Sequence, residues 1–153
     1  MGISPYVARL REHIGSDLLL LPCVTVLVEN EAGKILMVRN TGYKVWSTMG
    51  GMIEPREHPE AAVIREVKEE TNLDVEVIEL VTVLGGPECV VVYPNDDQVS
   101  YVACVYRAKP IGGIEQPDME EVGEIGWFDP TELAALDLDR FARYAFAEIG
   151  VLA

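Results

Sequence analysis

Three glutamates recur in one short segment at a spacing that groups their carboxylates. Glu66, Glu69 and Glu70 lie within residues 59–71, which open with Pro59 and continue with alanine, valine, isoleucine and long unbranched side chains. This composition, with proline in the first turn, is typical of an α-helix. At about 100° per residue, the three glutamates fall in one sector of about 100°. The sequence therefore predicts a helix that presents three carboxylates along one edge.

Two interpretations of this edge stay open. On an exposed helix, Arg65 and Glu69 would form an i,i+4 ion pair, and each like-charge contact would cost only a few tenths of a kcal/mol. On a partly buried helix, two carboxylates about 5.5 Å apart would repel by about 3 kcal/mol at an effective dielectric constant near 20. Such a site would bind either a proton or a divalent cation, and oxygen ligands suit Mg²⁺ or Mn²⁺.

The segments around this helix predict several strands and two further helices. Ser4 and Pro5 begin a predicted amphipathic helix over residues 4–14 that ends at Gly15, and Asn72 is a predicted left-handed stop for the glutamate helix. A last helix is expected within 140–149. Strands are expected at 18–21, 24–28, 35–38, 75–84, 99–106 and 125–128, with a hairpin joining 24–28 to 35–38. Segments 85–87, 93–97 and 111–119 are expected to be loops. These elements favour a mixed sheet covered on both faces.

Composition and charge limit the classes of partner. The chain has 153 residues, a net charge of −14 and 49% hydrophobic residues, which fits a folded domain and excludes disorder from a shortage of apolar residues. Its acidity argues against nucleic acids and anionic membranes as partners. An anionic substrate would therefore need a bound cation. Three scattered cysteines, and no segment resembling a leader or a membrane span, lead us to expect a cytoplasmic protein.

One motif resembles a known family. Gly51, five further residues, Glu57, seven further residues and then the run Arg65-Glu66-Val67-Lys68-Glu69-Glu70-Thr71-Asn72-Leu73 resemble the signature box of the Nudix hydrolases, except that Asn72 stands where the family has glycine. Residues 127–133 are similar to the family as well. The resemblance implies an α/β fold, a Nudix-type α/β/α sandwich around a mixed β-sheet. It would form a single domain over residues 1–153, with the box at 51–73.

The resemblance also implies roles for individual residues. In such a site Glu66, Glu69 and Glu70 would hold Mg²⁺ or Mn²⁺, and the carbonyl of Gly51 would be a further ligand. Arg65 would clamp the preceding loop through Glu57, and Glu57 would orient the site. Related enzymes often recruit another acid from outside the box, for which the preferred candidate is Glu121, ahead of Glu120 and Glu115.

The function implied is a divalent-metal-dependent pyrophosphohydrolase that cleaves a nucleoside diphosphate linked to a moiety X. The cation would activate water, and a glutamate would take its proton. The alternative is a Nudix-fold sensor that binds a nucleotide without turnover, although such modules typically lose glutamates that this chain keeps. The partner expected is a nucleotide-derived small molecule; a homodimer is common among relatives but nothing in the sequence establishes one. Candidates for substrate contact are Trp46, Tyr43, Tyr93 and Tyr101, and more weakly Arg39 and Arg107.

Overall fold

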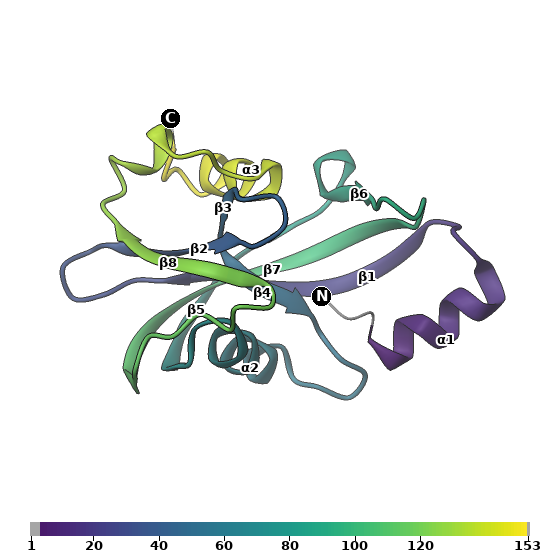
Figure 1. The fold of residues 1–153 in the computed structure, drawn as a ribbon, viewed down its shortest axis with the longest axis horizontal. Coiled ribbons are helices and arrows are strands. Elements are labelled where there is room, and N and C mark those ends of the chain that lie inside the picture. Colours follow the sequence, from purple (N-terminus) through teal and green to yellow (C-terminus); the bar gives the residue numbers. More distant parts are fainter. Residues whose placement is uncertain (1–3, 153) are drawn as a thin grey trace.

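The computed structural model describes residues 4–152, so the two ends of the domain expected over 1–153 lie outside the described residues. Figure 1 shows its strands between α2 and α3, with α1 beyond one end of the strands. The helices are α1 (Pro5–Ile14), α2 (Pro59–Thr71) and α3 (Arg140–Glu148). The strands are β1 (Leu19–Val28), β2 (Ile35–Asn40), β3 (Trp46–Ser47), β4 (Met49–Met52), β5 (Leu73–Leu84), β6 (Val90–Val92), β7 (Gln98–Gly113) and β8 (Val122–Phe128).

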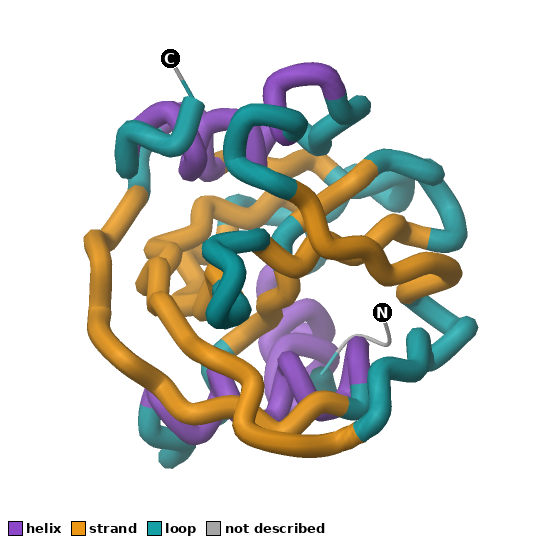
Figure 2. Tube along the Cα trace, turned by 90° about the vertical axis from the view of Figure 1, so that its left-hand side faces the viewer, coloured by secondary structure: helices purple, strands orange, loops and turns teal. Residues whose placement is uncertain are grey.

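The strands form two sheets. A five-stranded sheet has the order β4-β1-β7-β5, with β6 also paired to β7, and a three-stranded sheet has the order β3-β2-β8. Only the β1–β7 pair is parallel among these described strands, so the larger sheet is mixed, as the sequence predicted. Helices lie on opposite sides of the strand layers, which is clearest in the rotated view of Figure 2. The expected α/β/α sandwich is therefore confirmed.

Each outer helix covers its own part of the hydrophobic core. One cluster of buried side chains joins Val63 and Val67 of α2 to Val24 and Val26 of β1. A second cluster gathers around Phe146 of α3, with residues of β1, β2 and β7. Because β1 contributes to both clusters, it fixes the position of α2 relative to the rest of the domain.

The predicted hairpin between residues 24–28 and 35–38 is wrong, because these two segments do not pair as strands. Its turn does form, since the side chain of Asn30 accepts hydrogen bonds from the backbone N–H groups of Ala32 and Lys34. However, β1 pairs with β4 and β7, whereas β2 lies in the other sheet, and the two segments share only the isolated bridge between Glu29 and Ile35. Local turn chemistry predicted the change of direction. It could not show that both edges of β1 are occupied by strands distant in sequence.

The three helices begin and end close to where the sequence predicts. Ser4 caps α1 by accepting a hydrogen bond from the N–H of Val7, and Asn72 ends α2 with φ 58° and ψ 11°. Several strand predictions need correction. Residues 111–113, expected as loop, extend β7 by pairing with the start of β5, and the two strands expected at 18–21 and 24–28 are the single strand β1. Strands β3, β4 and β6 were not predicted. No helix in the described residues 4–152 is long and apolar enough to span a membrane.

The left-handed end of α2 leads to a testable prediction about stability. Asn72 carries a positive φ, and its side-chain amide donates to the carbonyl of Ile114 at 2.9 Å. Replacement by alanine removes that hydrogen bond and leaves a Cβ in left-handed backbone, which costs about 1–2 kcal/mol. We expect Asn72→Gly to be less destabilising than Asn72→Ala in urea unfolding followed by circular dichroism. Equal unfolding free energies for the two variants would contradict this account.

Candidate functional site

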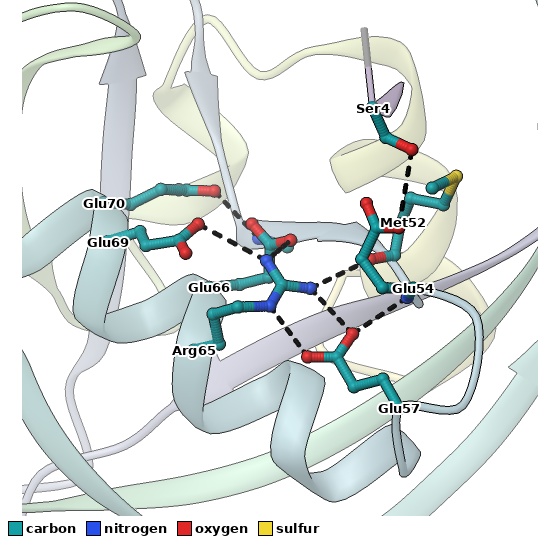
Figure 3. Close-up of polar contacts among 9 residues, drawn as sticks. Ser4, Met52, Glu54, Glu57, Arg65, Glu66, Glu69 and Glu70 are labelled. Carbon is teal, nitrogen blue, oxygen red and sulfur yellow. Dashed lines mark hydrogen bonds and ion pairs between the residues drawn. The ribbon is translucent and has the colours of Figure 1, made fainter. Parts of the chain in front are cut away.

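Arg65 is the centre of the polar network at the glutamate edge of α2 (Figure 3). Its Nε and Nη2 donate to the two carboxylate oxygens of Glu57 at 2.8 and 2.9 Å, and Nη2 also donates to the carbonyl of Met52 at 3.0 Å. Its Nη1 lies 2.6 Å from Glu66 Oε1 and 3.3 Å from Glu69 Oε2. One guanidinium therefore joins the end of β4, the loop before α2 and the helix itself.

The loop held by Arg65 is fixed from both sides. Glu57 Oε2 also accepts a hydrogen bond from the backbone N–H of Glu54 at 2.9 Å. The two-pronged contact with Arg65 holds the pKa of Glu57 below its usual range. The contacts with Glu57 and Glu66 in turn raise the pKa of Arg65, so this guanidinium is charged throughout the accessible pH range. The contact between Arg65 and Glu57 that the resemblance implies is therefore present.

The three glutamates of the helix edge differ in burial. Glu66 and Glu70 are buried, at 8% and 7% exposure, whereas the Glu69 side chain is 59% exposed. Glu69 forms the i,i+4 ion pair with Arg65 that the exposed-helix interpretation anticipated. The partly buried interpretation holds for the other two. The edge is therefore neither fully solvated nor fully enclosed.

Two glycines of β4 allow these carboxylates to lie against the backbone. A Cβ on Gly51 would overlap the carboxylate of Glu66, and one on Gly50 would overlap the backbone carbonyl of Val24 in β1. Gly50 also donates its N–H to Glu70 Oε1 at 3.3 Å. The absence of side chains therefore lets β4 pair with β1 on one side and contact two carboxylates on the other.

Burial is the main cause of the altered acidity of this pair. It raises the pKa of Glu66, an effect opposed by the contacts with Arg65. It raises the pKa of Glu70 well above the usual range, an effect opposed by the N–H of Gly50 and reinforced by the charges of Glu66 and Glu121. Without a further positive charge, Glu70 retains a proton at pH values where an exposed glutamate has lost it.

Of the three candidate acids outside the helix, only Glu121 lies at the cavity beside Glu66 and Glu70. Glu115 accepts a hydrogen bond from the indole N–H of Trp127 at 2.7 Å, and Glu120 is exposed. Asp118 also lines the cavity and was not predicted. Its Oδ1 accepts three backbone N–H groups, from residues 120–122, at 2.9 Å each. An aspartate preceding a tight turn was the sequence signal that could have indicated it.

A cavity of about 630 Å³ lies over the glutamate edge, within the size range of small-molecule sites. Among its described lining residues, seven carboxylates face two guanidinium groups. The carboxylates belong to Glu54, Glu66, Glu69, Glu70, Asp97, Asp118 and Glu121, and the guanidinium groups to Arg11 and Arg65. The remaining lining residues are Ser4, Val7, Leu21, Met52, Tyr93, Pro94, Asn95, Val99 and Tyr101.

The predicted substrate-contacting residues divide into two sets. Tyr93 and Tyr101 line the cavity, as the sequence analysis anticipated. Trp46 instead packs edge-on against Phe128 at 4.8 Å, and Tyr43 lies exposed on a turn. The two arginine candidates also lie away from the cavity lining, since Arg39 pairs with Glu124 and Arg107 with Glu79. No pattern in the sequence indicated that α1 contributes to the cavity wall, as it does in the structure.

The donor set suits a hard divalent cation, with one adjustment. Glu66 and Glu70 are buried carboxylates, of which Glu66 is paired with Arg65 and Glu70 accepts the N–H of Gly50, and oxygen ligands of this kind favour Mg²⁺ or Mn²⁺. As the side chains stand, no three acidic, imidazole or thiol groups among residues 4–152 converge on one point where a metal ion could sit. Arg65 Nη1 already contacts Glu66 and Glu69. Rotation of these side chains would be needed to present their oxygens to a cation.

Comparisons with known proteins agree with this geometry. The chain is 37% identical over 111 residues to a MutT-like protein of Streptomyces ambofaciens, covering 72% of this chain and 65% of the relative. It is 32% identical over 116 residues to the NAD-capped RNA hydrolase NudC of Vibrio atlanticus (strain LGP32), covering 74% of this chain and 39% of the relative. The chain thus spans less than two thirds of the length of either curated relative.

A solved structure supports the fold independently. The MutT protein of Methanosarcina mazei Go1 superposes with a TM-score of 0.71 at 20% identity, covering 88% of this chain and 95% of that one. A family model described as the NUDIX domain matches residues 19–149, which include β4, α2 and the loop between them. Because that match takes in most of the chain and both elements of the glutamate site, the chain belongs to the NUDIX family.

Proposed function

We propose that this chain is a divalent-metal-dependent pyrophosphohydrolase that cleaves a nucleoside diphosphate linked to a moiety X. The observation that carries the proposal is the pair of buried carboxylates, Glu66 and Glu70, in a cavity where carboxylates outnumber guanidinium groups. A pyrophosphate would be repelled from such a cavity unless cations accompanied it. Both guanidinium groups of the described cavity wall are already engaged by carboxylates and backbone carbonyls.

The proposed roles are those that membership of the family implies, and the burial of Glu66 and Glu70 supports them. Glu66, Glu69 and Glu70 hold Mg²⁺ or Mn²⁺, with the carbonyl of Gly51 and the carboxylate of Glu121 as additional ligands. When bound, the cation supplies neutralisation of phosphate charge and activation of water. Either Glu66 or Glu70 would take the proton of the activated water, since both line the cavity.

Arg65 and Glu57 position the carboxylates that we propose bind the cation. Arg65 holds Glu66 and Glu69 on one side and the loop through Glu57 on the other, so that β4 and α2 keep a fixed separation. The Glu66 carboxylate also lies against Gly51, where a Cβ would overlap it. We expect loss of either residue to reduce turnover through misplacement of Glu66.

The substrate we propose is a small molecule and not a nucleic acid, since the chain carries a net charge of −14. The names of the relatives, a MutT-like protein and an NAD-capped RNA hydrolase, support hydrolysis of pyrophosphate bonds in nucleotide-derived compounds. The three cysteines carry free thiols, which suits action in the reducing cytoplasm. We propose that the chain acts as one domain.

The function is tested by assaying purified protein against a panel of nucleotide derivatives with Mg²⁺ and with Mn²⁺. The panel comprises ADP-ribose, NAD, nucleotide sugars, dinucleoside polyphosphates, and canonical and oxidised nucleoside triphosphates. The proposal expects a nucleotide and a phosphorylated X from at least one member, and no turnover in EDTA. Binding of a panel member without turnover under any metal condition would instead favour a non-catalytic sensor.

Glutamine substitution tests the assignment of the buried carboxylates. Glu66→Gln and Glu70→Gln keep the side-chain size but remove the charge, so we expect kcat to fall by about 10²- to 10⁴-fold. The matched control is Glu60→Gln, an exposed position in the first turn of the same helix, which should retain full activity. Both site variants should keep the wild-type circular dichroism spectrum. Wild-type kcat in Glu70→Gln would refute the assignment.

The raised pKa of Glu70 predicts a characteristic pH dependence of stability. A carboxyl whose pKa is higher in the folded than in the unfolded protein stabilises most below the unfolded value, and this stabilisation is lost as pH rises through the folded value. In EDTA, the melting temperature should therefore decline as the pH rises above the usual range of a glutamate pKa, and Glu70→Gln should reduce that decline. Mg²⁺ should raise the wild-type melting temperature more at the higher pH. Identical pH profiles for the wild type and Glu70→Gln would contradict the prediction.

A further inference from the structure

Helix α1 forms part of the cavity although it lies outside the region that matches the family. The match begins at residue 19, whereas Ser4, Val7 and Arg11 line the cavity. These three residues are spaced so that they share one face of the helix. No residue of α1 is fully buried, and none belongs to the two buried core clusters. Figure 1 shows α1 beside the end of β1, away from the main helical layers.

Polar contacts of Arg11 hold α1 in place instead. Its Nη1 donates to the carbonyls of Gly15 and Asp17 at 3.0 and 2.6 Å, and its Nη2 donates to the carbonyl of Gln98 at 2.8 Å. Its Nε lies 3.4 Å from Asp97 Oδ1, and the Arg11 side chain is only 10% exposed. Arg11 thus joins α1 to the turn between β6 and β7, although these two elements lie far apart in the sequence.

That turn and strand β7 each contribute one tyrosine to the same cavity. The hydroxyl groups of Tyr93 and Tyr101 lie 2.7 Å apart, so the proton of one is shared with the other. Burial raises the pKa of Tyr101, which keeps its phenol protonated. Two hydroxyl groups carry two protons and only one lies between them. The second proton is available to a hydrogen-bond acceptor on a ligand.

This end of the cavity suits an uncharged ring. Apolar side chains of Val7, Leu21 and Val99 line it together with the two phenol rings. Phosphate would find no unengaged cation there, because Arg11 is already bound to three carbonyls and one carboxylate. A flat ring gains from aromatic contact and apolar burial, and a carbonyl on its edge could accept the remaining tyrosine proton.

We propose that α1, anchored by Arg11 to the β6–β7 turn, forms a selectivity wall that receives an uncharged ring of the substrate opposite the Tyr93–Tyr101 pair. The proposal rests on the proposed function, because it names the part of the nucleotide derivative that lies away from the carboxylates. Arg11 is a positioning residue in this account. It shapes the pocket and does not contact the pyrophosphate.

Steady-state kinetics of Arg11→Ala on the wild type's preferred substrate tests the proposal. Because the ring pocket loosens while the carboxylates are untouched, we expect KM to rise by about tenfold or more and kcat to change by less than about twofold. The ratio of kcat/KM between two substrates that differ in their ring should move closer to one. The control is Arg9→Ala on the exposed side of the same helix, which should match the wild type. Unchanged KM and selectivity in Arg11→Ala, or a fall in kcat alone, would overturn the proposal.

A second variant keeps the Arg11 contacts intact. Val7→Trp fills the ring end of the cavity from α1, so KM should rise with kcat and melting temperature unchanged. Wild-type KM in this variant would count against a ring at this position. If α1 were only a structural support, Arg11→Ala would lower the melting temperature and leave the substrate preference as it is.

Binding in EDTA separates this proposal from the proposed function. Calorimetry with the four common ribonucleosides, which carry no phosphate, measures ring recognition without metal or turnover. We expect at least one to bind the wild type and Arg9→Ala alike, and to bind Arg11→Ala about tenfold more weakly. That result, with no turnover of the panel above, would retain the ring pocket and reject the hydrolase. Absence of binding to the wild type, or equal binding to all three proteins, would reject the ring pocket.

Discussion

The candidate site depends on two buried carboxylates that have too little positive charge near them. Glu66 and Glu70 lie below the surface, and the guanidinium nearest to them is shared with Glu57 and Glu69. A buried carboxylate needs a compensating charge, a proton or hydrogen bonds, and burial without them is costly. Arg65 compensates Glu66 in part and a single N–H supports Glu70. A site left incomplete in this way is stable as a protein fold and favourable for a cation.

The surrounding fold keeps these two carboxylates buried although little positive charge lies near them. α2 must bury Val63 and Val67 to hold its place, and the same rotation of the helix brings Glu66 and Glu70 inward beside them. Gly51 of β4 lacks the side chain that would otherwise push the Glu66 carboxylate outward. Hydrophobic packing of the helix thus provides the free energy that keeps charged groups where they repel one another. The acidic edge and the apolar face are one structural unit.

Sequence reasoning succeeded where the determining interactions are local. The period of α2, the proline at its start and Asn72 at its end are all set within a few residues, and the structure has the helix at those bounds. It failed where distant segments decide. β1 and β2 separate into two sheets because β4 and β7 occupy the edges of β1, and Asp118 reaches the cavity only through the folded loop. The position of α1 depends on Arg11 reaching Gln98, a contact across 87 positions that no local pattern contains.

The two ends of the cavity are held by different forces, and this difference bears on how such a site can change. The carboxylate end is built into α2 and β4, whose packing is shared with the core, so a substitution there disturbs stability and chemistry together. The ring end is bounded by α1 and the β6–β7 turn, which meet through polar contacts of one arginine and bury no residue of α1. Substitutions at exposed positions of α1 therefore alter few buried contacts. On the selectivity role proposed for α1, substrate preference can therefore vary while the carboxylate end stays constant, because α1 adds no residue to either buried core cluster.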